Sequence, residues 1–218
     1  MFTNKIYRRI KMSAFLGPIH YWLYNKIQWH EDLLDSIYVL MEAQGQDVQL
    51  IRHYTAHEFG APERAELGEV IDGGNIHGWL QTKIQSLEYR MAYVITHALN
   101  NDILTLETLK KLYHDNGKLA YDSYPGSMQT PQEMFKAIYD YLLEGMPCDR
   151  VNQPISADEH AMIWIKKMCI HTDYWTAVKG DVKVHDTLRA EWLQGFVAGD
   201  FELEVPAENE FKLVRRAA

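Results

Sequence analysis

Apolar side chains recur at helical spacing along most of the chain. After Gly17, Pro18 stands at a first helical position, and apolar residues then follow every three or four positions until Gly45. The same period predicts further helices over the ranges 46–59, 62–71, 75–99, 105–116, 130–144, 156–178 and 184–198. No pair of alternating apolar and polar runs stands out. The predicted fold class is therefore all-α, a helical bundle of about seven or eight helices.

Local signals place some of the helix ends. Residues 130–133 (Thr-Pro-Gln-Glu) and residues 156–159 (Ser-Ala-Asp-Glu) both match the capping box that opens a helix. Asn116 and Gly117 predict the end of the helix that covers 105–116, since glycine is common just after a helix.

A fifteen-residue segment occurs twice, starting at Gly17 and at Gly74. Nine of its positions are identical in the two copies, where chance predicts about one. The identical pairs are Gly17/Gly74, Ile19/Ile76, His20/His77, Trp22/Trp79, Leu23/Leu80, Lys26/Lys83, Ile27/Ile84, Gln28/Gln85 and Glu31/Glu88. The chain therefore contains an internal duplication, with tandem copies over about 17–73 and 74–130.

The duplicated segment repeats charged and polar groups as well as apolar ones. In each copy a His and a Glu share one helical stripe with two apolar residues, namely His20, Leu23, Ile27 and Glu31 in the first copy and His77, Leu80, Ile84 and Glu88 in the second. Within one helix the His and the Glu are about 16 Å apart and cannot meet. If the copies pack antiparallel, His20 approaches Glu88. His77 then approaches Glu31 in the same way.

Three interpretations of these four residues remain open. A buried carboxylate needs a partner, so His–Glu hydrogen bonds could serve only to fix the register of the helices. Alternatively His20, Glu31, His77 and Glu88 bind a divalent transition metal between facing helices. In the third interpretation His20 and His77 act as hydrogen-bonding or acid/base groups in a ligand pocket.

Other patterns give weaker signals. His53 and His57 have the i, i+4 spacing that lets two imidazoles hold one metal, but no H-E-x-x-H motif is present. Each copy of the repeat places a lysine four residues after a tryptophan, which predicts a cation–π or snorkelling contact, with the lysine stem on the indole and its charge in water. Residues 184–192 resemble a degenerate third copy, with His185 in the position of the repeated histidine.

Composition limits the class of protein. The net charge of −8 argues against a nucleic-acid binder, and no apolar run is long enough to span a bilayer. The two cysteines, Cys148 and Cys169, form no C-x-x-C motif and indicate a reducing, cytoplasmic location. Residues 1–11 are expected to be a flexible basic tail or a start foreign to the native protein. Residues 12–198 are expected to form a single all-α domain, followed by a tail over 199–218.

The sequence thus predicts a soluble helical-bundle protein that binds a metal ion or small ligand through the repeated His/Glu positions in its core. The alternative is a non-catalytic interaction or regulatory module in which these pairs only fix helix register. Its partner surface would then lie among aromatic residues in the second half of the chain, Tyr121, Tyr124, Trp175 and Trp192. A homo-oligomer remains open, and no catalytic or cofactor-binding residue is identified.

Overall fold

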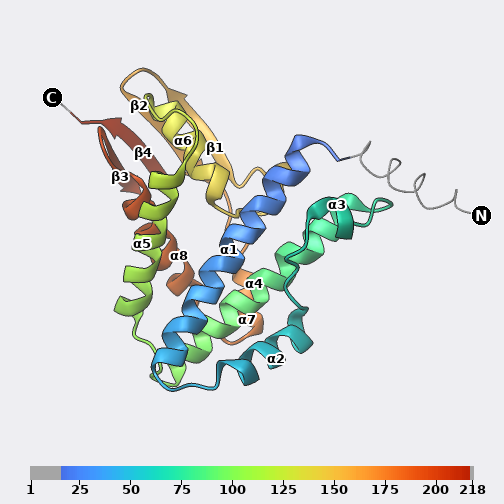
Figure 1. Ribbon diagram of the computed structural model, residues 1–218. Coiled ribbons are helices and arrows are strands. Elements are labelled where there is room, and N and C mark those ends of the chain that lie inside the picture. Colours follow the sequence, from blue (N-terminus) through green and yellow to red (C-terminus); the bar gives the residue numbers. More distant parts are fainter. Residues whose placement is uncertain (1–15, 217–218) are drawn as a thin grey trace, which may run out of the picture.

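The computed structural model describes residues 16–216, which form eight α-helices and one four-stranded antiparallel sheet (Figure 1). The helices are α1 (Pro18–Ala43), α2 (Val48–Phe59), α3 (Leu67–Val70), α4 (Ile76–Asn100), α5 (Leu106–Ser123), α6 (Pro131–Tyr141), α7 (Thr172–Ala177) and α8 (Val182–Phe196), with a 3₁₀ helix η1 (Pro147–Asp149). The strands are β1 (Asn152–Ala157), β2 (Ala161–Lys166), β3 (Phe201–Ala207) and β4 (Glu210–Arg215). The fold is mixed α/β, so the prediction of an all-α protein is wrong.

The largest departure concerns residues 156–178, for which the sequence predicts one helix. Asp158 does not cap a helix. Its Oδ1 accepts hydrogen bonds from the backbone N–H groups of His160 and Ala161, both at 2.8 Å. These bonds close the turn between β1 and β2. In β2 the side chains alternate, and Trp164 is completely buried. This period of two, with β-branched isoleucines between the buried positions, is typical of a half-buried strand.

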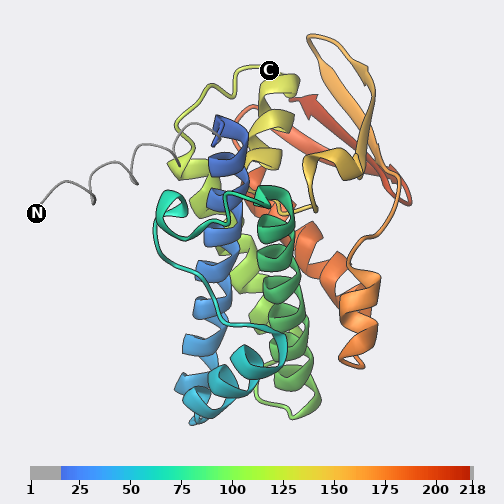
Figure 2. The ribbon, with the colours of Figure 1, turned by 90° about the vertical axis from the view of Figure 1, so that its right-hand side faces the viewer.

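The segment after Gly199, expected to be a tail, contains β3 and β4. The sheet has the order β1-β2-β4-β3, and every neighbouring pair is antiparallel. Buried side chains of β3 and β4, such as Phe201 and Leu213, join a core cluster with residues of α6 and α8. The sheet and α6 lie together at one end of the helical bundle (Figure 2).

The duplicated segments begin the two long helices α1 and α4, which lie side by side and run in the same direction (Figure 2). The rings of His20 and His77 have centroids 5.6 Å apart near the starts of these helices. The antiparallel packing predicted for the copies is therefore wrong. The physical reason is the connection: α2, α3 and the segments around them carry the chain back to the starting end of α1 before α4 begins.

Helix α5 continues through Gly117, where the sequence predicts its end, and stops at Ser123. A Cβ atom on Gly117 would lie 2.1 Å from the backbone O of Trp192 in α8. Likewise, a Cβ atom on Gly195 of α8 would lie 2.0 Å from the backbone O of His114 in α5. The two glycines thus let α5 and α8 approach backbone to backbone.

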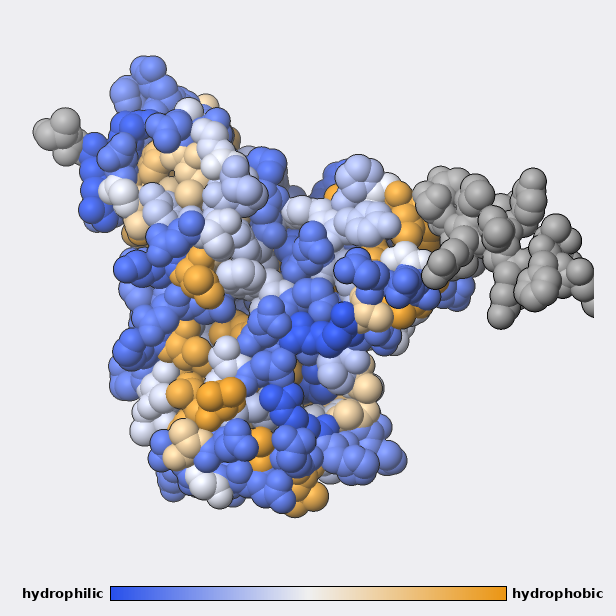
Figure 3. Space-filling view, in the orientation of Figure 1, coloured by the Kyte–Doolittle hydropathy of each residue, from blue (hydrophilic) through white to orange (hydrophobic). Residues whose placement is uncertain are grey.

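The face of the molecule shown in Figure 3 is largely hydrophilic, and apolar side chains gather along α5. Trp175 and Trp192 belong to the core, each 2% exposed, so they cannot belong to the partner surface suggested by the sequence. Within residues 16–216 no helix has both the length and the apolar character needed to cross a membrane. The predicted basic tail of residues 1–11 lies outside the described residues.

Candidate functional site

The repeated histidines lie near the surface rather than in the core. His20 is half-buried and its Nδ1 accepts a hydrogen bond from the backbone N–H of Gly17 at 3.0 Å. His77 is exposed. The two imidazoles neighbour each other, but neither lies beside Glu31 or Glu88, because parallel helices keep positions that are eleven residues apart at different heights.

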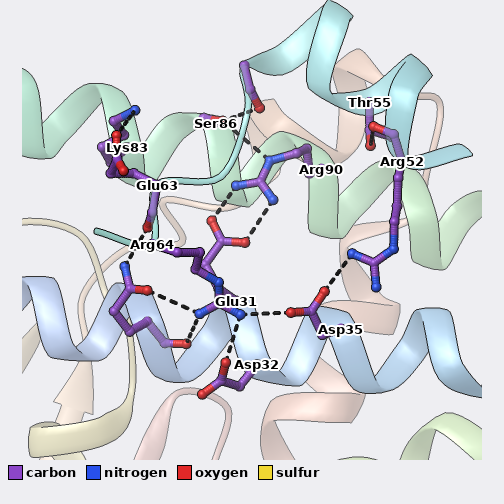
Figure 4. Close-up of polar contacts among 12 residues, drawn as sticks. Glu31, Asp32, Asp35, Arg52, Thr55, Glu63, Arg64, Lys83, Ser86 and Arg90 are labelled. Carbon is purple, nitrogen blue, oxygen red and sulfur yellow. Dashed lines mark hydrogen bonds and ion pairs between the residues drawn. The ribbon is translucent and has the colours of Figure 1, made fainter. Parts of the chain in front are cut away.

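Glu31 is held in a buried ion pair between α1 and α4 (Figure 4). Arg90 donates to it from both ends of the guanidinium, with Nη1 at 2.8 Å from Oε2 and Nη2 bonded to Oε1. The Nε of Arg90 donates to Ser86, whose hydroxyl donates to the backbone O of Gly60. Both oxygens of Glu31 thus accept hydrogen bonds from the protein, and the ion pair links α1 to α4.

Glu88 faces a different neighbour from its counterpart in the first copy. Its Oε2 lies 3.0 Å from Nδ1 of His171, the residue just before α7. His53 and His57 are both exposed on α2. In the part of the chain that the structure describes, no three His, Cys, Asp or Glu side chains are arranged to hold a metal ion. The prediction of a metal-binding protein is therefore corrected.

A cavity of about 50 Å³ lies at the centre of the molecule, between α1, α4, α5 and α8, and we call it the polar pocket. Its polar lining comes from six elements or connections and comprises His30, Glu88, Tyr113, Glu144, His171, His185 and Arg189. Its apolar lining comprises Leu87, Met91, Leu142, Leu143 and Trp192. Of the metal ligands predicted from sequence, only Glu88 lies here.

Two histidines stack in the wall of the polar pocket. The ring of His171 lies over that of His185, with centroids 3.8 Å apart and an interplanar angle of 27°. His171 is held by Glu88, as described above, whereas Nδ1 of His185 is buried without a hydrogen-bond partner. The nearest acid to this atom is Asp186, whose Oδ1 is 3.5 Å away. The stack therefore pairs a satisfied imidazole with one that has unused hydrogen-bonding capacity.

The pKa values of the two stacked imidazoles are shifted in opposite directions. Burial alone would lower the pKa of His171, but the carboxylates of Glu88 and Glu144 outweigh it and raise that pKa. Burial, together with the positive charge of His171, lowers the pKa of His185 to about 4. At neutral pH His185 is thus a neutral imidazole, stacked on a ring whose pKa is raised. His30 is also neutral, because burial lowers its pKa to about 4.

A second ion pair closes the other side of the pocket. The Nε of Arg189 donates to Oε1 of Glu144 at 2.6 Å, and Asn152 donates to the other carboxylate oxygen at 3.1 Å. Burial would raise the pKa of Glu144, but the charge of Arg189 lowers it to about 2. Tyr113 completes the lining, and its hydroxyl donates only to the sulfur of Met91, at 3.6 Å. A thioether is a weak acceptor, so Tyr113 also has hydrogen-bonding capacity to spare.

Sequence reasoning located part of this site. Glu88 is predicted as a metal ligand in the repeat, and His185 appears only as a residue of the degenerate third copy. His171 also appears in the sequence as a histidine of the 156–178 segment, but the predicted helix placed it wrongly. Nothing in the local sequence marks Glu144 or Arg189, because their pairing depends on how the α6–β1 connection meets α8.

The neutral histidines predict a decrease in stability at mildly acidic pH. Their folded pKa values of about 4 lie below the unfolded value of about 6.5, so the unfolded chain binds more protons between these limits. Each histidine therefore contributes stability above pH 6.5 that is lost as the pH falls toward 4, on the order of 3 kcal/mol. His171 has the opposite sign: its contribution is complete below pH 6.5 and is lost as the pH rises through its raised pKa.

Urea denaturation of the wild type and His185→Phe between pH 4.5 and 7.5 measures this effect. The variant should lose less unfolding free energy than the wild type on going from pH 6.5 to 4.5. Parallel curves for the two proteins would contradict a neutral, buried His185.

Fold and site together define a mixed α/β protein with a helical bundle that encloses a polar pocket. Comparison with protein-family models, curated proteins and solved structures finds no match to this chain.

Proposed function

We propose that the protein binds a small polar molecule without net charge in the polar pocket. The observation that carries this proposal is the imidazole of His185 in the cavity wall. Within residues 16–216 its buried Nδ1 forms no hydrogen bond of ordinary geometry and has only the 3.5 Å contact with Asp186. Leaving a buried polar atom unpaired costs about 1–3 kcal/mol, and native structures pair nearly all such atoms. A ligand that hydrogen-bonds to this imidazole would remove that cost.

The charges around the pocket argue for a neutral ligand. Glu144 is paired with Arg189, and Glu88 lies 3.0 Å from His171, whose pKa that carboxylate raises, so neither carboxylate lacks a partner. An added anion or cation would be desolvated without a free partner of opposite charge, which costs several kcal/mol. The groups with spare capacity are His185 and Tyr113, which are both uncharged at neutral pH.

The size of the cavity limits the ligand to a few non-hydrogen atoms. A water molecule needs about 10–15 Å³ by this measure, so 50 Å³ holds a molecule of the size of urea or acetamide. The apolar lining would contact the parts of the ligand that form no hydrogen bonds. This proposal follows the third interpretation of the sequence, a ligand pocket with histidines as hydrogen-bonding groups. The histidine that binds the ligand is now His185 rather than His20 or His77, and Glu88 still lines the pocket.

The test is a titration with three probes of similar size: acetamide, acetate and methylammonium. Acetamide should shift the side-chain ¹H–¹⁵N signals of His185 and raise the melting temperature, whereas the two ions should do neither. His185→Phe keeps a ring stacked on His171 but removes the nitrogen, and it should abolish the response. The matched control is His53→Phe, which replaces an exposed histidine on α2 and should respond like the wild type.

Two results would contradict the proposal. One is an equal response to all three probes in His185→Phe and in the wild type. The other is no response to any uncharged probe in the wild type, together with a stability change in His185→Phe. The second result would favour the interaction or regulatory module, in which the polar side chains of the core serve only to fix register.

A further inference from the structure

Lys26 and Lys83 occupy equivalent positions of the duplication, but they differ in burial and in ion pairing. Each lysine lies over the tryptophan four residues before it, which confirms the contact predicted from sequence: Nζ is 4.1 Å from the Trp22 ring centroid for Lys26 and 5.2 Å from the Trp79 ring centroid for Lys83. Lys83 also lies 3.9 Å from the carboxylate of Glu63 and keeps 23% of its side chain exposed. Lys26 is only 4% exposed.

The acidic groups near Lys26 are engaged by other donors. Asp140 accepts from the indole of Trp22 at 2.8 Å and also from Tyr124 and Lys136. Glu144 accepts from Arg189 and from a side-chain amide, as described above. Within residues 16–216 no carboxylate forms an ion pair with the Lys26 amine. Burial without such a partner favours the neutral amine and lowers the pKa of Lys26 to about 8, although the charges of Glu144 and Asp140 oppose this.

Lys26 also lines a cavity of about 210 Å³, distinct from the polar pocket, between the start of α1, α6, η1 and β1. Aromatic and apolar side chains, including Trp22, Phe135 and Val151, form much of its wall, and Arg150 lies at its edge. This volume is large enough for a small organic molecule beside Lys26. A lysine desolvated in an apolar pocket is an activated nucleophile toward carbonyl carbon.

We propose that Lys26 is a nucleophilic lysine that condenses with small aldehydes bound in the cavity between α1, α6 and β1. The lone pair of Nζ attacks the carbonyl carbon, and the π electrons of the C=O bond move to oxygen. One amine hydrogen is transferred to this oxygen, which gives a carbinolamine. The carbinolamine then loses its hydroxyl group and the remaining amine hydrogen as water, which leaves an imine between the aldehyde carbon and Nζ. The step consumes no oxidant or reductant, and hydrolysis reverses it.

The availability of the free amine sets the expected selectivity. At pH 7.5 about a quarter of Lys26 is neutral, whereas an ordinary lysine is neutral in about one molecule in a thousand. Enclosure of the amine slows entry of the reagent, and we therefore expect Lys26 to react at least about tenfold faster than Lys83.

The experiment treats the folded full chain with limiting propanal and cyanoborohydride at pH 7.5, which reduces each imine to a stable secondary amine. Peptide mass spectrometry then compares propylation at Lys26 and Lys83 over time. Preferential labelling of Lys26 supports the proposal, and a rate at Lys26 no higher than at Lys83 overturns it. Lys26→Arg should lose the fast adduct and Lys83→Arg should retain it.

A further variant keeps the test decisive if Lys26→Arg does not fold. Lys26→Met replaces a buried amine by an apolar side chain of similar length, and it should fold and lose the fast adduct. Persistence of the fast adduct on another lysine in this variant would overturn the proposal. Labelling of Lys26 should be unchanged in His185→Phe, so the result does not depend on whether the polar pocket binds a ligand.

Discussion

Replacing Gly117 by alanine is expected to destabilise the protein by about 3 kcal/mol or more, or to prevent folding. In an open helix this change would stabilise by about 1 kcal/mol, because alanine is the better helix former. Here the new Cβ would lie 2.1 Å from a backbone carbonyl oxygen of α8, which cannot rotate away as a side chain could. The helices α5 and α8 would have to separate, and the core side chains between them would lose their packing.

Equilibrium urea denaturation of the purified variant measures this cost. Gly195→Ala should behave alike, because its Cβ would lie 2.0 Å from the backbone O of His114. Gly68→Ala is the matched control, since it is helical and its Cβ would meet only the Tyr21 hydroxyl at an ordinary 3.6 Å. A midpoint for Gly117→Ala equal to that of Gly68→Ala would show that α5 and α8 are not this close in solution.

Replacing Arg90 by methionine is expected to cost about 3–5 kcal/mol of unfolding free energy. Arg90 and Glu31 are almost fully buried, with 4% and 5% of their side chains exposed. Removal of the guanidinium leaves the Glu31 carboxylate in the interior without a counter-charge, and that desolvation is the main cost. Arg64→Met is the control: Arg64 pairs with Asp32 and Asp35 on the surface of α1, where an ion pair is worth about 0–1 kcal/mol.

The double variant Glu31→Leu/Arg90→Met separates the loss of the pair from the isolated charge. It removes both charges and fills the space with apolar groups, so it should recover most of the stability lost in Arg90→Met. Chemical denaturation of the two single variants and the double variant gives the coupling energy. If the two single losses simply add in the double variant, the buried pair described for α1 and α4 is absent in solution.

The two capping-box motifs show how far local sequence reaches. At residues 130–133 the motif forms as predicted: Thr130 accepts from the backbone N–H of Glu133, and Glu133 accepts from that of Thr130. Apolar residues at helical spacing follow it, and Met134 and Ile138 are buried. At residues 156–159 the same motif is followed by the alternating pattern of β2. The longer apolar pattern therefore decides between helix and strand, because burial of a whole face outweighs a single cap.

By itself the sequence determined the two long helices that the repeats begin, their lysine–tryptophan contacts and the helical stripe that Glu31 and Glu88 share with buried apolar residues. These features depend on residues within a few turns of one helix, where spacing alone sets which side chains share a face. Only the tertiary structure decided the partners of the two glutamates. Arg90 reaches Glu31 because α1 and α4 run parallel, and His171 reaches Glu88 because the chain returns from the sheet to place α7 against α4. Long-range connections set these contacts, and helical periodicity carries no information about them.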